Sequence, residues 1–216
     1  MNSTHQAVLD SLYRQYIEVI KPLIALWESR EEKFMLPVFN EVRAFNDHIA
    51  RCYANNATEH YIEIQLKGAS RHINRMMLDC YKYLNTSFKK EIEKFEEKVK
   101  NVDLSIIDNG DFVIKYKNLR NDTVVFLNHA KILEHKDISD EEKYNAFETA
   151  LNSYMELSEL VNLNFTKINW AKAKSLLKKY SWILSAIASG LVSILLADML
   201  GCKLFENLWH LIFKSN

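Results

Sequence analysis

The 216-residue chain holds only 4 Gly and 2 Pro, whereas average usage predicts roughly 15 and 11 in a chain of this length. Because strands need turns and turns depend on such residues, this scarcity argues against β-sandwiches, β-barrels and doubly wound sheets, and predicts an all-α protein. The net charge is zero, but seven Lys against two acidic residues give the segment from Thr166 onward a charge of +5. The first 165 residues are therefore acidic, which makes them a poor nonspecific nucleic-acid binder.

The first predicted helix starts near Ser3 or Thr4, because apolar residues recur from there at spacings of three and four. Pro22 lies inside this pattern and predicts a kink. A second helix is predicted from Pro37, a residue that suits the first helical turn, to about Tyr53.

A third, long helix is predicted from Thr58 to Asn101, with Gly68 as its one interruption. Its second half carries a narrow apolar stripe among Lys and Glu, formed by Tyr81, Leu84, Phe88, Ile92, Phe95 and Val99. The stripe fits a helix packed on one side, and it also fits a self-associating coiled coil.

A strong turn signal at residues 108–111 precedes a fourth predicted helix from Asp111 to Lys136. Ser139 followed by Glu142 forms a capping box, which predicts the start of a fifth helix that ends near Phe165. These helices group residues 1–165 into one cytosolic helical bundle with a long extended helix.

Residues 181–197 contain no charge, and Lys178, Lys179, Tyr180 and Trp182 lie at their start. A helix needs about 17 to 20 apolar residues to cross a bilayer, and basic and aromatic residues anchor it at the interface. The sequence therefore predicts a basic juxtamembrane linker at 166–180 and a transmembrane helix at 181–201. A buried helix of a larger core and a helix lying in the membrane interface are the alternatives.

Five Lys precede the segment and two follow it, so the positive-inside rule places the N-terminal domain in the cytoplasm. Residues 202–216 show the spacing of a terminal amphipathic helix. Small residues within the predicted span recur at a spacing that lets helices approach closely and predicts a homo-oligomer. They are Ser185, Ala186, Ser189, Gly190 and Ser193.

Two of the predicted helices carry His and Arg beside their apolar faces. Packed antiparallel, they would form a partly buried polar network, which fixes helix register or binds an RNA or nucleotide phosphate. The residues of this network are Arg43, Asp47, His48 and Arg51 on one helix and His72, Arg75 and Asp79 on the next.

The spacing Arg43-x4-His48 resembles the R-x4-6-H pattern of HEPN domains, over about residues 5–135. The resemblance implies a helical bundle and, in active members, metal-independent ribonuclease activity carried here by Arg43 and His48. Ala44 follows Arg43, where active members usually have a polar residue. A HEPN-like domain with a membrane segment also resembles membrane-associated accessory proteins of CRISPR and other antiphage systems, some of which form pores.

The sequence contains no HExxH or CxxC spacing and no nucleophile motif, so neither a metal nor another cofactor is expected. The favoured function is a self-associating antiphage effector that is anchored in the membrane and perturbs or permeabilises it. Its expected partners are a second copy, the lipid membrane and RNA, a nucleotide or a defence-system protein. A membrane-tethered HEPN ribonuclease and a non-enzymatic scaffold that recruits a partner to the membrane are the alternatives.

Overall fold

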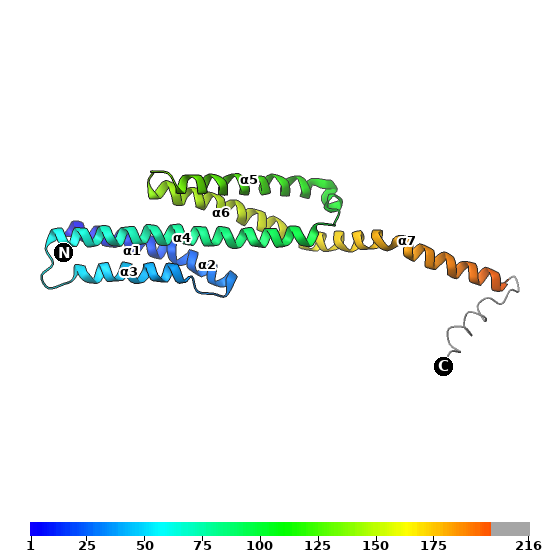
Figure 1. Cartoon of the computed structure of the whole chain (residues 1–216), viewed down its shortest axis with the longest axis horizontal. Helices are drawn as coiled ribbons and strands as arrows, with labels where there is room; N and C mark the ends of the chain where they lie inside the picture. Colours follow the sequence, from blue (N-terminus) through cyan, green and yellow to red (C-terminus); the bar gives the residue numbers. More distant parts are fainter. Residues whose placement is uncertain (200–216) are drawn as a thin grey trace, which may run out of the picture.

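The computed structural model describes residues 1–199, and every regular element in this range is a helix (Figure 1). The elements are α1 (Ser3–Gln15), η1 (Tyr16–Ile20), α2 (Lys21–Glu31), α3 (Leu36–Cys52), α4 (Glu59–Val99), η2 (Leu104–Gly110), α5 (Asp111–Glu134), α6 (Asp140–Leu163) and α7 (Phe165–Met199). The prediction of an all-α fold is confirmed. The predicted amphipathic tail at 202–216 lies outside the described residues.

The first predicted helix is divided at Pro22, as its sequence indicates. α1 begins at Ser3, where the Asn2 side chain accepts a hydrogen bond from the His5 backbone N–H at 2.9 Å. A π-helical turn, η1, then precedes α2, and its cap is closed by the Lys21 N–H, which donates to the Tyr16 carbonyl. Since Pro22 has no N–H to donate, the wider turn absorbs the interruption without breaking the rod.

The 41-residue helix α4 is the central helix of the bundle, and its two halves pack against different helices. The first half lies against α1 and α3 on one side, and the second half lies against α6 on the other, with α5 packed on α6 (Figure 1). Leu84, Phe88 and Ile92 of the charged second half are buried in the core shared with α6. This stripe therefore packs within the chain, and the coiled-coil alternative is not needed.

Short-range interactions determine where α5 and α6 begin. Asp108, Asn109 and Gly110 have positive φ angles of 48°, 54° and 97°, which turn the chain into α5. Ser139 and Glu142 form the predicted capping box at the start of α6. Buried Asn85 of α4 donates to the Phe147 carbonyl of α6 at 2.8 Å, so one polar side chain ties the hairpin to α4.

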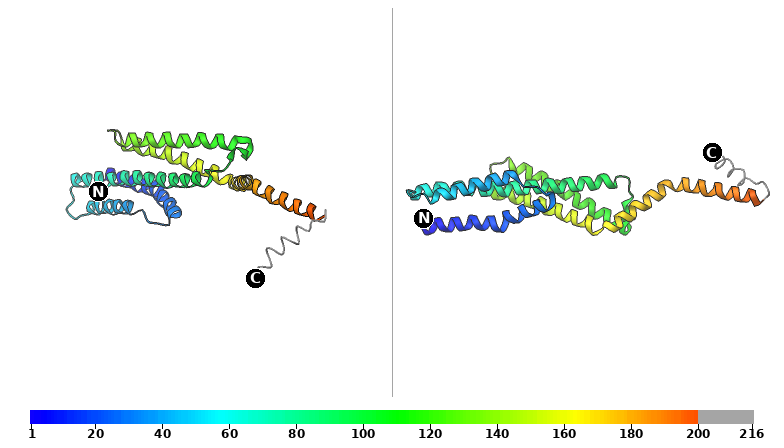
Figure 2. Two further views of the ribbon diagram at one scale, coloured as in Figure 1. Left: turned by 45° about the vertical axis from the view of Figure 1, so that its right-hand side comes forward. Right: turned by 90° about the horizontal axis from the view of Figure 1, so that it is seen from below.

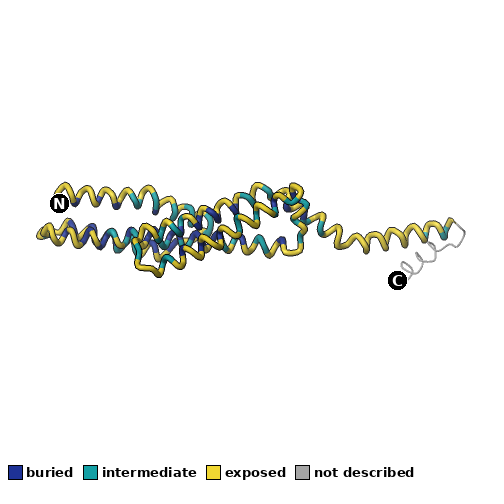
Figure 3. The backbone as a smooth tube through the Cα atoms, turned by 90° about the horizontal axis from the view of Figure 1, so that it is seen from above, coloured by how far each residue is buried: buried dark blue, intermediate teal, exposed yellow. Residues whose placement is uncertain are grey.

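The last described helix, α7, runs for 35 residues and leaves the bundle at the end opposite the N-terminus (Figures 1 and 2). Only Ile168 and Ala171 are buried, in a small core shared with η2, α4 and α5. Beyond them α7 is almost wholly exposed (Figure 3). The predicted linker at 166–180 and the described part of the predicted span, 181–199, are therefore parts of one continuous helix.

Candidate functional site

The projecting part of α7 presents its apolar side chains to the surroundings on all sides. Among the described residues, α7 is the one helix long and apolar enough to cross a membrane. Trp182, at the start of the uncharged stretch, is 69% exposed, and Leu191, near its middle, is 55% exposed. A helix that is apolar all round is buried in a large protein or spans a membrane, and the bundle does not bury this one.

The small residues on α7 meet no other part of the described chain. A Cβ added at Gly190 would have no neighbour within 4 Å. The Ser189 hydroxyl donates to the Ala186 carbonyl at 3.0 Å, and the Ser193 hydroxyl donates to the Ser189 carbonyl at 2.8 Å. These bonds within the helix satisfy the two hydroxyls and leave Ser185, Ala186, Ser189, Gly190 and Ser193 open to a neighbouring helix.

A second site candidate is a polar cluster in the seam between α3 and α4. His48 Nδ1 bonds Gln65 Oε1 at 2.8 Å, and His72 Nδ1 bonds a Glu41 carboxylate oxygen at 2.5 Å. The two imidazole rings lie side by side, with centroids 5.2 Å apart. Glu41 and His48 are two turns apart on α3, and Gln65 and His72 are two turns apart on α4, so antiparallel packing produces both pairs.

Gly68 of α4 allows this seam to close. A Cβ at position 68 would lie 2.5 Å from Cε1 of His48, closer than any real contact. The ring cannot move away easily, because Gln65 bonds it and His72 lies beside it. The glycine that interrupts the long helix in sequence is therefore the contact point between α3 and α4.

The structure brings together only part of the predicted network. His48 and His72 meet, but Arg43, Asp47, Arg51 and Arg75 are exposed, and no hydrogen bond or ion pair within residues 1–199 joins them to the histidines. Sequence reasoning missed the true partners, Glu41 and Gln65. The signal that identifies them is the seven-residue spacing shared by both helices.

Asp79, the last member of the predicted network, lies two turns beyond His72 on α4 and is half-buried. Burial raises the pKa of its carboxyl above the usual value, and the Lys82 ammonium opposes that shift. Its surroundings therefore favour the neutral acid more than water does, but Asp79 forms no contact with either histidine that would join it to a catalytic pair.

Over its described range the chain is an all-helical bundle from which one helix, long and apolar enough to cross a membrane, projects. Comparison with family models, with curated proteins and with solved structures finds no match to this chain. The resemblance to HEPN domains therefore stays a prediction that rests on Arg43 and His48.

We expect Arg43→Ala to change the free energy of unfolding by no more than about 0.5 kcal/mol, because its side chain is exposed. His48→Ala should cost about 1–3 kcal/mol, because it strips buried Gln65 of its partner. Thermal melting of both variants, beside an RNA cleavage assay, checks this. If the wild type cleaves RNA, and His48→Ala loses that cleavage while its melting temperature is unchanged, the chain is a ribonuclease instead.

Proposed function

We propose that the chain is a membrane-anchored, self-associating effector of bacterial antiphage defence, which perturbs or permeabilises the inner membrane through α7. The observation that carries the proposal is a continuous helix, rooted in a folded bundle, whose uncharged stretch is exposed and bears small residues. The defence setting comes from the resemblance to membrane-associated antiphage proteins.

The first support is the free-energy cost of exposing the apolar side chains of α7 to water. Water-exposed apolar area costs about 25 cal/mol per Å², and α7 exposes Trp182, Leu184, Ile187, Leu191 and Leu195, each by more than half of its surface. The bundle has cores of its own and leaves this segment uncovered. A bilayer supplies the missing apolar environment, and the length of the segment fits its hydrocarbon thickness.

The second support is the charge on α7 before the apolar stretch. Lys167, Lys172, Lys174, Lys178 and Lys179 all lie on the side of the bundle. Under the positive-inside rule this end stays in the cytoplasm, together with α1–α6. Lys178 and Lys179 reach the headgroup layer, where Tyr180 and Trp182 provide the aromatic anchors.

We expect the full chain to sediment with membranes and to resist carbonate extraction, while a chain that ends at Leu163 remains in the supernatant. Two of the three core clusters lie wholly within residues 1–163, so the shorter chain keeps most of its packing. Fractionation followed by immunoblotting measures both. If the full chain stays soluble without detergent, the proposal is wrong, and α7 is instead a helix buried against a partner.

A further inference from the structure

A cavity of about 440 Å³ lies where α2, α4, α6 and α7 meet, at the end of the bundle from which α7 leaves. Lys90, Lys94 and Lys98 occupy successive turns of α4 along one wall, and Lys172 of α7 reaches the same cavity. Apolar side chains, among them Phe165, also line the cavity, together with polar groups and with Arg30, Glu31 and Glu91 of the network described next. The cavity is thus lined by more basic than acidic side chains and by several apolar ones.

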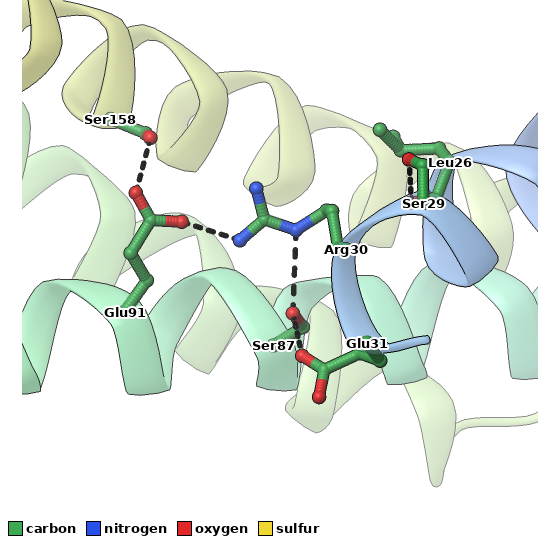
Figure 4. A network of polar contacts seen from close by, with 7 residues as sticks. All are labelled: Leu26, Ser29, Arg30, Glu31, Ser87, Glu91 and Ser158. Atoms are coloured by element: carbon green, nitrogen blue, oxygen red, sulfur yellow. Dashed lines mark hydrogen bonds and ion pairs between the residues drawn. The ribbon is translucent and has the colours of Figure 1, made fainter. Parts of the chain in front are cut away.

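The acidic side chains of this cavity are already engaged. Glu91 pairs with Arg30 and accepts a hydrogen bond from Ser158 at 2.7 Å, while Glu31 accepts one from Ser87 (Figure 4). The Arg30 guanidinium in turn lies 3.4 Å above the centroid of the Phe88 ring. Arg30 and the two carboxylates therefore form a closed network at one end of the cavity.

The four lysines, by contrast, have no acidic partner within residues 1–199. No ion pair or hydrogen bond in this range joins Lys90, Lys94, Lys98 or Lys172 to a carboxylate. Lys172 is half-buried, although it carries a positive charge. Clustered like charges raise each other's free energy, and an anion that binds among them relieves this.

A second cavity, of about 600 Å³, continues from the first toward the apolar stretch of α7. Lys98 and Lys172 line both cavities, and Lys178 and Lys179 add to the second. Two carboxylates also line the second cavity: Glu97, which pairs with Lys100, and Asp103, which accepts hydrogen bonds from Ser105. From Lys172 to Ser181 the helix rises about 13 Å, so Lys172 lies beyond the headgroup layer of one leaflet, which is roughly 5–8 Å deep. A lipid headgroup reaches Lys172 by rising out of that layer along Lys178 and Lys179, which line the second cavity.

We propose that these two cavities form a binding site for a phosphate-bearing anion, held by Lys98 and Lys172 and supplied by the headgroup of an anionic phospholipid. The lipid source rests on the proposed membrane insertion of α7, whereas the phosphate chemistry does not. Ammonium groups bind phosphate oxygens as point charges, and the apolar wall at Phe165 accommodates the less polar part of the ligand.

The test measures binding to the full chain in uncharged detergent micelles by microscale thermophoresis. The probes are dioleoyl phosphatidylglycerol, dioleoyl phosphatidylcholine and inorganic phosphate. We expect saturable binding of phosphatidylglycerol that Lys98→Gln with Lys172→Gln weakens about 30-fold, since each lysine near an anionic lipid contributes about fivefold. Phosphatidylcholine, which has no net charge, should not saturate the site.

The matched control is Lys89→Gln with Lys167→Gln, which removes the same charge from the same two helices. Lys89 pairs with Glu93 and Lys167 pairs with Asp108, and none of these four residues lines either cavity. We expect this control to bind phosphatidylglycerol within about twofold of the wild type, because both target lysines remain. Equal weakening in the two double variants would overturn the proposal, because it would show diffuse attraction to surface charge.

Inorganic phosphate distinguishes the source of the ligand. Three results together support the site: phosphate binds the wild type, phosphate displaces phosphatidylglycerol, and the double variant Lys98→Gln with Lys172→Gln binds phosphate more weakly. Binding of phosphate without phosphatidylglycerol supports the phosphate site and overturns its lipid source. Binding of neither overturns the proposal altogether. Sedimentation of the double variant with membranes, measured in parallel, reports separately on the insertion of α7.

Discussion

Replacement of residues 181–197 by an unrelated single-span helix is expected to abolish membrane permeabilisation while the protein still sediments with membranes. Lipid tails are as apolar as leucine, so helices in a bilayer associate by close packing and not by hydrophobicity. Close packing requires small residues, and Ser189 and Gly190 are exposed to a neighbouring helix. The replacement keeps the anchor and removes the contact surface.

Single substitutions refine this test. Gly190→Leu or Ser189→Leu keeps the segment apolar but should weaken the oligomer about tenfold, because an interhelical contact contributes about 1–2 kcal/mol. Leu191→Phe is the matched control, since it adds bulk about 200° around the helix from Ser189. Crosslinking in vesicles and dye release measure assembly and permeabilisation. Full activity after replacement of the whole segment would assign the function to the bundle alone, as the ribonuclease and scaffold alternatives require.

Gly68→Ala is expected to destabilise the bundle by about 1–3 kcal/mol, although alanine is the better helix former by about 1 kcal/mol. The reason is the His48 ring, whose Cε1 would lie 2.5 Å from the new Cβ. The ring is held by Gln65 and flanked by His72, so α3 itself must move away from α4. Urea denaturation followed by circular dichroism measures the loss.

A double-mutant cycle separates the clash from other effects of the substitution. In a His48→Ala background the obstructing ring is gone, so Gly68→Ala should become neutral or stabilising by up to about 1 kcal/mol. Lys67→Ala, at an exposed neighbouring position, is the control and should stay within about 0.5 kcal/mol of the wild type. If Gly68→Ala stabilises the chain while His48 is present, the close approach of α3 and α4 is contradicted.

Local signals in the sequence were sufficient for most of the fold. The capping box at Ser139, the cap at Thr58 and the turn before Asp111 each act through their own backbone neighbours, so they locate helix ends without tertiary information. Pro22 disturbs its own helix for the same reason. The α-helices predicted from these signals are present in the structure.

The polar seam could not be predicted in the same way, because it depends on the register between two helices. Periodicity identifies the face of each helix, but sliding α3 along α4 by one turn would exchange every cross-helix partner. The prediction grouped the histidines with Arg and Asp by helical spacing, whereas the actual register pairs them with Glu41 and Gln65. The close approach at Gly68 determines that register, and it becomes visible only in three dimensions.

The continuity of α7 couples the rotational orientation of the bundle to that of the apolar segment. Ser189 follows Ala171 by eighteen residues, which is five full turns at about 3.6 residues per turn. Ala171 is buried against the bundle, so Ser189 points toward the side on which the bundle sits. In an oligomer joined through Ser189, as proposed above, the bundles would turn toward the central axis of the assembly. The width of the bundles, and not only the affinity between spans, would then limit how many copies such an oligomer holds.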